Sequence, residues 1–178
     1  DIQGVDIESN PYSLIEKLSL KNGETIPTVE QYLTEGKKYP NLKMIYEIKP
    51  HKTEENENRV VLATLELVKK LGVEDQVEYI SFSKYICEQL WNHNPKSHVS
   101  YLKGDLTPTE IKQLGFTGID YHFSLFEKNP TWIKEAQSLG LIVNAWTVNK
   151  EKDMQKLLNQ NIDYITTDQP ELLQKLIQ

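Results

Sequence analysis

Short apolar runs alternate with segments of helical pattern from residue 42 to the end of the chain. The apolar runs predict strands at residues 42–48, 77–82, 98–102, 118–123, 141–148 and 162–167. The segments between them predict helices at residues 59–71, 84–91, 108–115, 130–140 and 150–159, with a last helix after residue 168. Strict alternation of strand and helix predicts a parallel sheet with crossover helices.

Local signals predict where the helices begin and end. The segments 28–31 and 107–110 begin with Thr and end with Gln or Glu, which is the pattern of a capping box. Gly72 follows the apolar positions of residues 59–71 and is a stop signal. Asn149 and Asp168 each precede a helical pattern, so we expect both side chains to cap helices.

The first 41 residues differ from the rest of the chain. Residues 1–22 show no strong periodicity and are interpreted as the end of a surface excursion or insertion. A helix that ends near Gly36 follows, and we expect it to pack on the sheet. Residues 23–178 therefore form the predicted α/β part. On pattern alone it is either a complete six-stranded α/β domain or a (β/α)8 TIM-type barrel lacking the first two strands.

Composition narrows the class of protein. Hydrophobic residues make up 38% of the chain, which fits a folded globular protein. The net charge of −6 and the lack of a basic run argue against a nucleic-acid partner, and no apolar stretch approaches the ~18 residues of a membrane span. Cys87 is the only cysteine, so the chain has no internal disulfide framework. Arg59 is the only arginine, so phosphate binding would rest on lysines, backbone amides or a metal.

Glu47 and Lys49 are the most informative candidate pair. Both lie at the end of the first predicted strand, two residues apart, so their side chains leave the same face of the strand. If the apolar alternate positions meet the helices, Glu47 points into the mouth of a barrel. A carboxylate beside an ammonium suits a site for a divalent cation and a phosphoryl oxygen. The alternative is a simple ion pair at an exposed strand end.

Other strand ends carry further candidates. Trp146 is either part of the core or an apolar wall for a small polyol. Asp168 is most simply a helix cap. Of the four histidines only His122 lies near the end of a predicted strand, and no Ser-His-Asp arrangement follows from the spacing. No Gly-rich loop follows any strand, which argues against a dinucleotide or P-loop site.

Five segments in order carry a family resemblance. They are I-P-T-V-E-Q-Y-L at 26–33, Y-E-I-K at 46–49, S-F at 81–82, A-W-T-V-N at 145–149 and D-Y-I-T-T-D-Q-P at 163–170. Together they resemble the glycerophosphodiester phosphodiesterase family from about residue 23 to the end. The resemblance implies a (β/α)8 barrel that hydrolyses glycerophosphodiesters to glycerol phosphate and an alcohol with Ca²⁺ or Mg²⁺.

The resemblance also implies roles for individual residues. Glu47 would be a metal ligand, Lys49 would contact the phosphoryl group, and Trp146 would pack against the glycerol backbone. Tyr121 would line the same mouth. No predicted strand here carries the family's His-Arg-Gly, Glu-x-Asp or His-Asp motif. The catalytic histidines and further metal ligands are therefore expected upstream of Asp1, and this stretch by itself is expected to be inactive.

Two other readings stay open on the sequence. One is a different phosphate-handling TIM-barrel enzyme of the isomerase or aldolase type, which would need a lysine or carboxylate base and no metal. The other is a non-catalytic α/β binding domain that begins at Asp1. Members of the resembling family are often exported, so a periplasmic or exported location is favoured over others.

Overall fold

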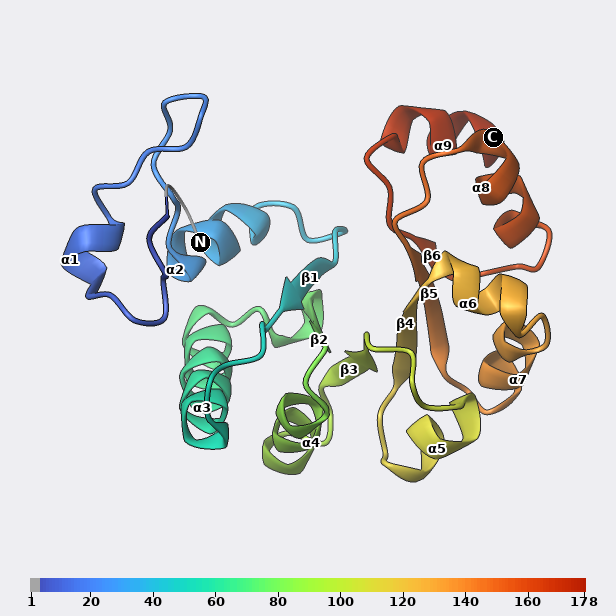
Figure 1. The fold of residues 1–178 in the computed structure, drawn as a ribbon, viewed down its shortest axis with the longest axis horizontal. Coiled ribbons are helices and arrows are strands. Elements are labelled where there is room, and N and C mark those ends of the chain that lie inside the picture. Colours follow the sequence, from blue (N-terminus) through green and yellow to red (C-terminus); the bar gives the residue numbers. More distant parts are fainter. Residues whose placement is uncertain (1–3) are drawn as a thin grey trace.

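A single parallel sheet organises the chain. The computed structural model describes residues 4–178, and its six strands are hydrogen-bonded in the order of the sequence (Figure 1). The strands are β1 (Met44–Glu47), β2 (Val77–Ser81), β3 (His98–Tyr101), β4 (Gly118–His122), β5 (Ile142–Trp146) and β6 (Tyr164–Ile165). Every neighbouring pair is parallel. This confirms all six predicted strands, with ends that differ by a few residues.

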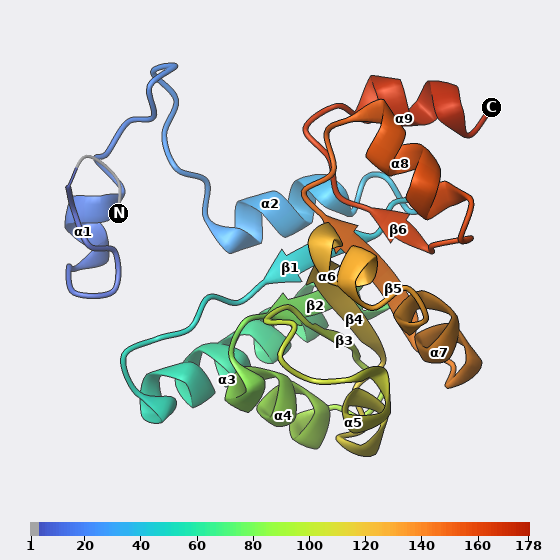
Figure 2. The same ribbon diagram turned by 45° about the vertical axis from the view of Figure 1, so that its right-hand side comes forward.

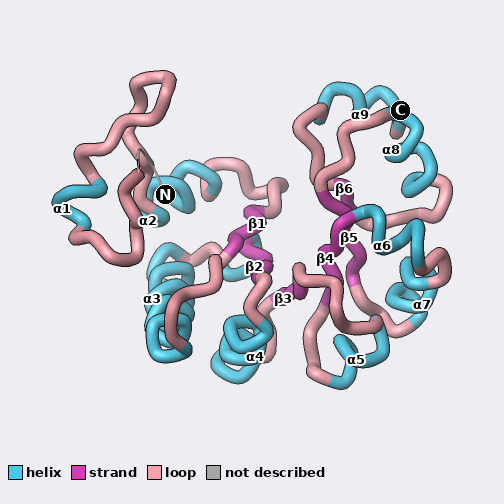
Figure 3. Tube along the Cα trace, viewed as in Figure 1, coloured by secondary structure: helices cyan, strands magenta, loops and turns pink. Residues whose placement is uncertain are grey.

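Helices cover the outer face of the curled sheet, as Figures 1 and 2 show. They are α2 (Val29–Gly36), α3 (Glu54–Leu71), α4 (Lys84–His93), α5 (Pro108–Gln113), α6 (Phe123–Lys128), α7 (Trp132–Ser138), α8 (Glu151–Leu158) and α9 (Pro170–Leu176). A short 3₁₀ turn at Glu74–Gln76 leads from α3 into β2. The tube in Figure 3 shows the alternation of strand and helix that the sequence predicts.

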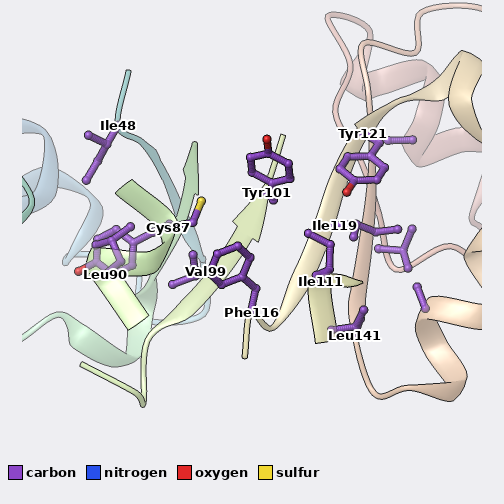
Figure 4. Close-up of a cluster of buried hydrophobic side chains, with 14 of the residues drawn as sticks. Ile48, Cys87, Leu90, Val99, Tyr101, Ile111, Phe116, Ile119, Tyr121 and Leu141 are labelled. Atoms are coloured by element: carbon purple, nitrogen blue, oxygen red, sulfur yellow. The ribbon is translucent and has the colours of Figure 1, made fainter. Parts of the chain in front are cut away.

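The hydrophobic core lies between the sheet and these helices. Strand residues alternate between the helix side and the inner, concave side, and the helix-side positions are mostly apolar and buried. On β1, Met44 and Ile48 belong to this core while Ile45 is 49% exposed. Figure 4 shows part of this buried cluster, with Val99 and Tyr101 of β3 and Ile119 and Tyr121 of β4. The concave face is therefore the side on which Glu47 and Lys49 were predicted to lie.

Local signals explain most helix ends. Thr28 with Gln31, and Thr107 with Glu110, form the two predicted capping boxes. Gly72 ends α3 with a φ of 64°, a left-handed conformation that glycine adopts without steric cost. Helix α3 begins earlier than predicted, because Thr53 accepts a hydrogen bond from the Asn56 N–H and caps a polar first turn.

Two expectations about helix caps are wrong, and one helix was missed. Helix α6 was not predicted; it begins directly after β4, where the His122 ring accepts a hydrogen bond from the Ser124 N–H. The N-cap of α8 is Lys150 rather than Asn149, and the N-cap of α9 is Gln169 rather than Asp168. Neither of these caps uses a side chain. Asn149 and Asp168 bind each other instead.

The segment before α2 projects away from the sheet (Figure 1). In its described part it contains one short helix, α1 (Tyr12–Ile15), and an isolated bridge between Ser19 and Thr25. Most of its side chains are exposed. Its interpretation as the end of an insertion, and the assignment of β1–β6 to strands 3–8 of a barrel, stay predictions; residues 1–3 lie outside the described part. Within residues 4–178 no helix has both the length and the apolar character needed to cross a membrane.

Candidate functional site at the carboxyl ends of the strands

Glu47 and Lys49 meet at the end of β1. Lys49 Nζ donates to Glu47 Oε1 over 2.6 Å, and the Lys49 side chain is 71% exposed while that of Glu47 is 28% exposed. Ile45, two residues earlier, lines a cavity on the concave face, so Glu47 shares that face. The structure thus brings the predicted carboxylate and ammonium together at the expected edge of the sheet.

Aromatic rings form a platform at the ends of β4 and β5. His122 and Trp146 are paired in register across the two strands, and their rings meet edge to face at 5.1 Å between centroids. Phe82, which follows β2, also meets the Trp146 ring edge to face, at 5.6 Å between centroids. Trp146 Nε1 donates to the Asp120 carbonyl oxygen over 2.8 Å. This bond fixes the indole, so Trp146 offers a rigid apolar surface at the edge.

A group of hydrogen-bonded polar side chains lies next to this platform, two residues earlier on each strand and on the concave face. Asn144 Nδ2 donates both to Asp120 Oδ1 and to Thr166 Oγ1, each over 2.8 Å. Asp120 is 3% exposed, and burial raises the pKa of its carboxyl group to about 7. The hydrogen bond from Asn144 opposes that rise, and the charge of Glu47 adds to it. These groups line a cavity of about 150 Å³.

Sequence reasoning missed Asp120 and Asn144. A signal was available, because Asp120 lies two residues before His122 and Asn144 two residues before Trp146. The period of two places each on the same face as the later residue. What the sequence could not give was the hydrogen bond between them, which depends on the register of β4 and β5.

Tyr121 does not line the mouth, so that expectation is wrong. Its side chain is 0% exposed and lies on the helix side of β4, where its ring stacks with Phe126 at 6.3 Å (Figure 4). Its hydroxyl donates to the Leu106 carbonyl oxygen over 2.9 Å. The alternation of the strand explains this, because Asp120 takes the concave side and Tyr121 the opposite one. Burial raises the pKa of the Tyr121 hydroxyl far above its usual range.

The N-terminal segment docks on the loop that follows Lys49. Lys52 Nζ binds Asp6 Oδ2 over 2.7 Å and also contacts Ser9, while the Lys52 N–H donates to Glu8 Oε1 over 3.0 Å. The hydrogen bond from Lys52 is the main cause that lowers the pKa of Asp6 to about 2. Residues 4–10 are thus tied to the β1–α3 loop by charge-assisted hydrogen bonds.

The carboxylate oxygens of Glu47 are the type of ligand that a hard divalent cation such as Ca²⁺ or Mg²⁺ prefers. Ca²⁺ takes about six to eight oxygen ligands, often from carboxylates. Among the described residues no three His, Cys, Asp or Glu side chains are grouped so as to hold a metal ion. A cation held by Glu47 would therefore need further oxygen ligands besides this carboxylate.

Comparisons with known proteins agree with the predicted family. The model of the glycerophosphoryl diester phosphodiesterase family matches residues 3–172. A solved glycerophosphodiester phosphodiesterase from Parabacteroides distasonis is 42% identical, with a TM-score of 0.97, and the match covers 99% of this chain and 74% of that one. A solved Oleispira antarctica phosphodiesterase, crystallised with the product sn-glycerol-3-phosphate, shares the fold at 22% identity, with a TM-score of 0.79 over 94% of this chain and 70% of that one.

A curated glycerophosphodiester phosphodiesterase from Caldanaerobacter subterraneus subsp. tengcongensis is 25% identical over 115 residues. That match covers 64% of this chain and 47% of the relative, so the chain spans about half the length of this curated relative. The family match extends over nearly the whole chain, and the solved Parabacteroides structure superimposes on almost all of it. The parallel sheet is correspondingly part of a TIM-barrel type of fold, and the chain belongs to the glycerophosphoryl diester phosphodiesterase family.

Proposed function

We propose that the protein containing this chain hydrolyses glycerophosphodiesters to glycerol phosphate and an alcohol, with Ca²⁺ or Mg²⁺. The observation that carries the proposal is the Glu47–Lys49 pair, joined over 2.6 Å at the strand end of a chain that belongs to this family. The Oleispira relative was crystallised with sn-glycerol-3-phosphate, the product class that the proposal assigns here. The full (β/α)8 barrel, with β1–β6 as strands 3–8, is part of the proposal.

The proposal gives each residue one role. Lys49 places its ammonium group against a phosphoryl oxygen and offsets the negative charge that grows there during attack on phosphorus. Its side chain is 71% exposed and pairs with Glu47, so it can turn from Glu47 to the substrate. Glu47 supplies a carboxylate oxygen to the cation. When bound, the cation would polarise the phosphoryl group and lower the cost of its charge.

Trp146 forms the wall for the glycerol part of the substrate. Its ring is fixed by edge-to-face contacts with Phe82 and His122 and by the hydrogen bond from its indole N–H. A fixed apolar surface beside polar groups suits a small polyol, which has C–H groups on one side and hydroxyls on the other. The two catalytic histidines are expected in sequence that precedes Asp1, and export to the periplasm stays a prediction.

The test is a hydrolysis assay on the protein in its natural length. Release of glycerol phosphate from glycerophosphocholine and glycerophosphoethanolamine should depend on Ca²⁺ or Mg²⁺ and stop with a chelator. Glu47→Gln should remove the metal-dependent turnover, because an amide oxygen is a far weaker ligand for a hard cation than a carboxylate. If Glu47→Gln kept the turnover and its metal dependence, the role of Glu47 would be wrong. Turnover that ignores a chelator would instead favour a metal-free phosphate-handling barrel.

A further inference from the structure

Glu57 is a buried carboxylate that the proposed chemistry does not use. It lies in the first turns of α3 and is 6% exposed. Its Oε1 accepts a hydrogen bond from the His51 N–H over 3.1 Å, and its Oε2 accepts one from the Ser83 hydroxyl over 2.8 Å. A buried carboxylate is costly unless such donors satisfy it, and the positive end of the helix dipole adds support. Glu57 thus ties the β1–α3 loop to the β2–α4 loop.

Ser81 continues this connection to the strand end. Its side chain is fully buried, and its hydroxyl donates to the Ile48 carbonyl oxygen over 2.7 Å. The same hydroxyl oxygen accepts from the Ser83 N–H over 3.0 Å. Ile48 stands between Glu47 and Lys49 in the chain. One unbroken series of hydrogen bonds therefore runs from Glu57 through Ser83 and Ser81 to the peptide between the two candidate site residues.

The contacts lie on both sides of Lys49. Ser81 fixes the carbonyl of Ile48, and Glu57 fixes the N–H of His51. The Lys49 side chain is 71% exposed, and its ion pair is with Glu47, which lies on the same strand end. Its position relative to a substrate is therefore set by the backbone of residues 48–51. The Glu57 side chain holds that backbone from the helix side, through its hydrogen bond with the His51 N–H. Figure 2 shows α3 and α4 side by side beneath this loop.

We propose that Glu57 is a positioning residue that holds Lys49 and Glu47 in place for phosphodiester hydrolysis. It acts through the His51 N–H and the Ser83 hydroxyl and is too deeply buried to touch substrate. The inference rests on the proposed function of the Glu47–Lys49 pair. Misplacement of a catalytic group by about 1 Å can cost about 10²-fold in rate, so loss of this tie should act on turnover rather than on substrate affinity.

The main test compares Glu57→Ala with Glu57→Gln in the natural-length protein. Glu57→Ala leaves the His51 N–H and the Ser83 hydroxyl without their acceptor, so kcat should fall by about 10–100-fold while KM changes less than about threefold. Glu57→Gln should recover most of kcat, since its amide oxygen still accepts from His51 and its amide N–H can donate to Ser83 Oγ. The activation constant for the metal should rise in Glu57→Ala, because Glu47 lies on the same loosened strand end.

A matched control separates positioning from general destabilisation. Met154→Ala removes a fully buried side chain of α8, far along the sheet from β1. It should lower the melting temperature without changing kcat or the metal activation constant of the folded enzyme. If Glu57→Ala behaved like Met154→Ala in all three readouts, Glu57 would be merely structural. If Glu57→Ala does not fold, Ser83→Ala removes one of the two contacts and should lower kcat in the same direction.

Amide hydrogen exchange tests the same idea without any activity. In Glu57→Ala, exchange at residues 48–52 should become at least about tenfold faster, while Glu57→Gln and Met154→Ala leave this segment protected. Unchanged exchange in Glu57→Ala would overturn the proposal even if turnover fell. If the unmodified protein showed no diesterase activity, the proposed function would fail, and the exchange result would still decide whether Glu57 holds the loop.

Discussion

Asn149 and Asp168 bind each other reciprocally across the ends of β5 and β6. Asn149 Nδ2 donates to Asp168 Oδ2 over 2.8 Å, and Asn149 Oδ1 accepts from the Asp168 N–H over 2.8 Å. The Thr167 hydroxyl also donates to Asn149 Oδ1, over 3.1 Å. Strand β6 has only two residues, so this clamp adds to a short backbone ladder. Two side chains that look like helix caps in the sequence instead join the carboxyl ends of two neighbouring strands.

Asn149→Ala should therefore weaken the last β-α unit. The substitution leaves the Asp168 N–H and the Thr167 hydroxyl without their protein acceptor, although water can reach them. We expect a loss of about 1 kcal/mol in the free energy of unfolding, measured by urea titration. Asn92→Ala, at an exposed position of α4, should change stability by less than about 0.5 kcal/mol. Equal effects of the two variants would mean that the clamp contributes nothing.

The sequence predicts the fold better than it predicts side-chain partners. All six strands follow from short apolar runs, because a sheet covered by helices needs apolar residues at its strand positions. Both capping boxes follow from residues three positions apart, which find each other within one turn. Asn149 was misread because its true partner, Asp168, lies beyond a whole helix and is brought near only by the pairing of β5 with β6.

In the candidate site, too, contacts between residues close in sequence could be predicted, whereas contacts that depend on the fold could not. Glu47 and Lys49 could be paired from sequence, since two residues on one strand share a face whatever the rest of the chain does. Tyr121 was assigned to the mouth from the family resemblance, although the alternation of I-D-Y-H places it with Ile119, on the face opposite Asp120 and His122. Glu57 gave no signal at all. It stands among other charged residues at the start of α3, and only the fold reveals that it is the buried one.

Lys49 should matter for turnover in a way that a similar lysine does not. Lys49→Met should lower kcat on the order of 10²–10³-fold, because it removes a charge that faces the phosphoryl oxygens in the transition state. Lys103 is the matched control, because it also follows a strand, pairs with a carboxylate two residues away at 2.9 Å and has a 60% exposed side chain. Lys103→Met should leave kcat within about twofold, and both variants should keep their stability within about 1 kcal/mol. A similar loss from both lysines would point to general electrostatics instead of a specific contact.

Trp146 should control affinity for the glycerol part of the substrate. Trp146→Ala removes the apolar surface that the glycerol carbons would bury, so the binding free energy of the substrate becomes less favourable. We expect KM to rise by about 10–100-fold. Trp146→Phe keeps a ring but loses the bond to the Asp120 carbonyl, so an intermediate KM is expected. Trp91→Phe, on α4 at the outer side of the sheet, serves as the control for loss of an indole. Steady-state kinetics on glycerophosphocholine would decide; an unchanged KM in Trp146→Ala would remove Trp146 from the site.

Asp120 should make the stability of the protein depend on pH. Burial raises the pKa of its carboxyl group from 3.8 to about 7, so between these values the folded protein binds a proton that the unfolded chain does not. The contribution of this group to the free energy of unfolding is therefore greatest at acidic pH. It falls as the pH rises towards about 7 and is constant above that pH.

Asp120→Asn removes this dependence and keeps an acceptor for Asn144 Nδ2. Between about pH 5 and about pH 8 the unmodified protein should lose about 2–3 kcal/mol more stability than the variant. Urea titrations in the presence of a chelator would measure the difference. The chelator removes any divalent cation, so that Glu47 is the charge that influences the pKa of Asp120. Parallel pH curves for the two proteins would show that Asp120 stays ionised in its buried position, held by Asn144. A larger loss in the unmodified protein would establish a neutral carboxylic acid beneath the Trp146 platform at acidic pH.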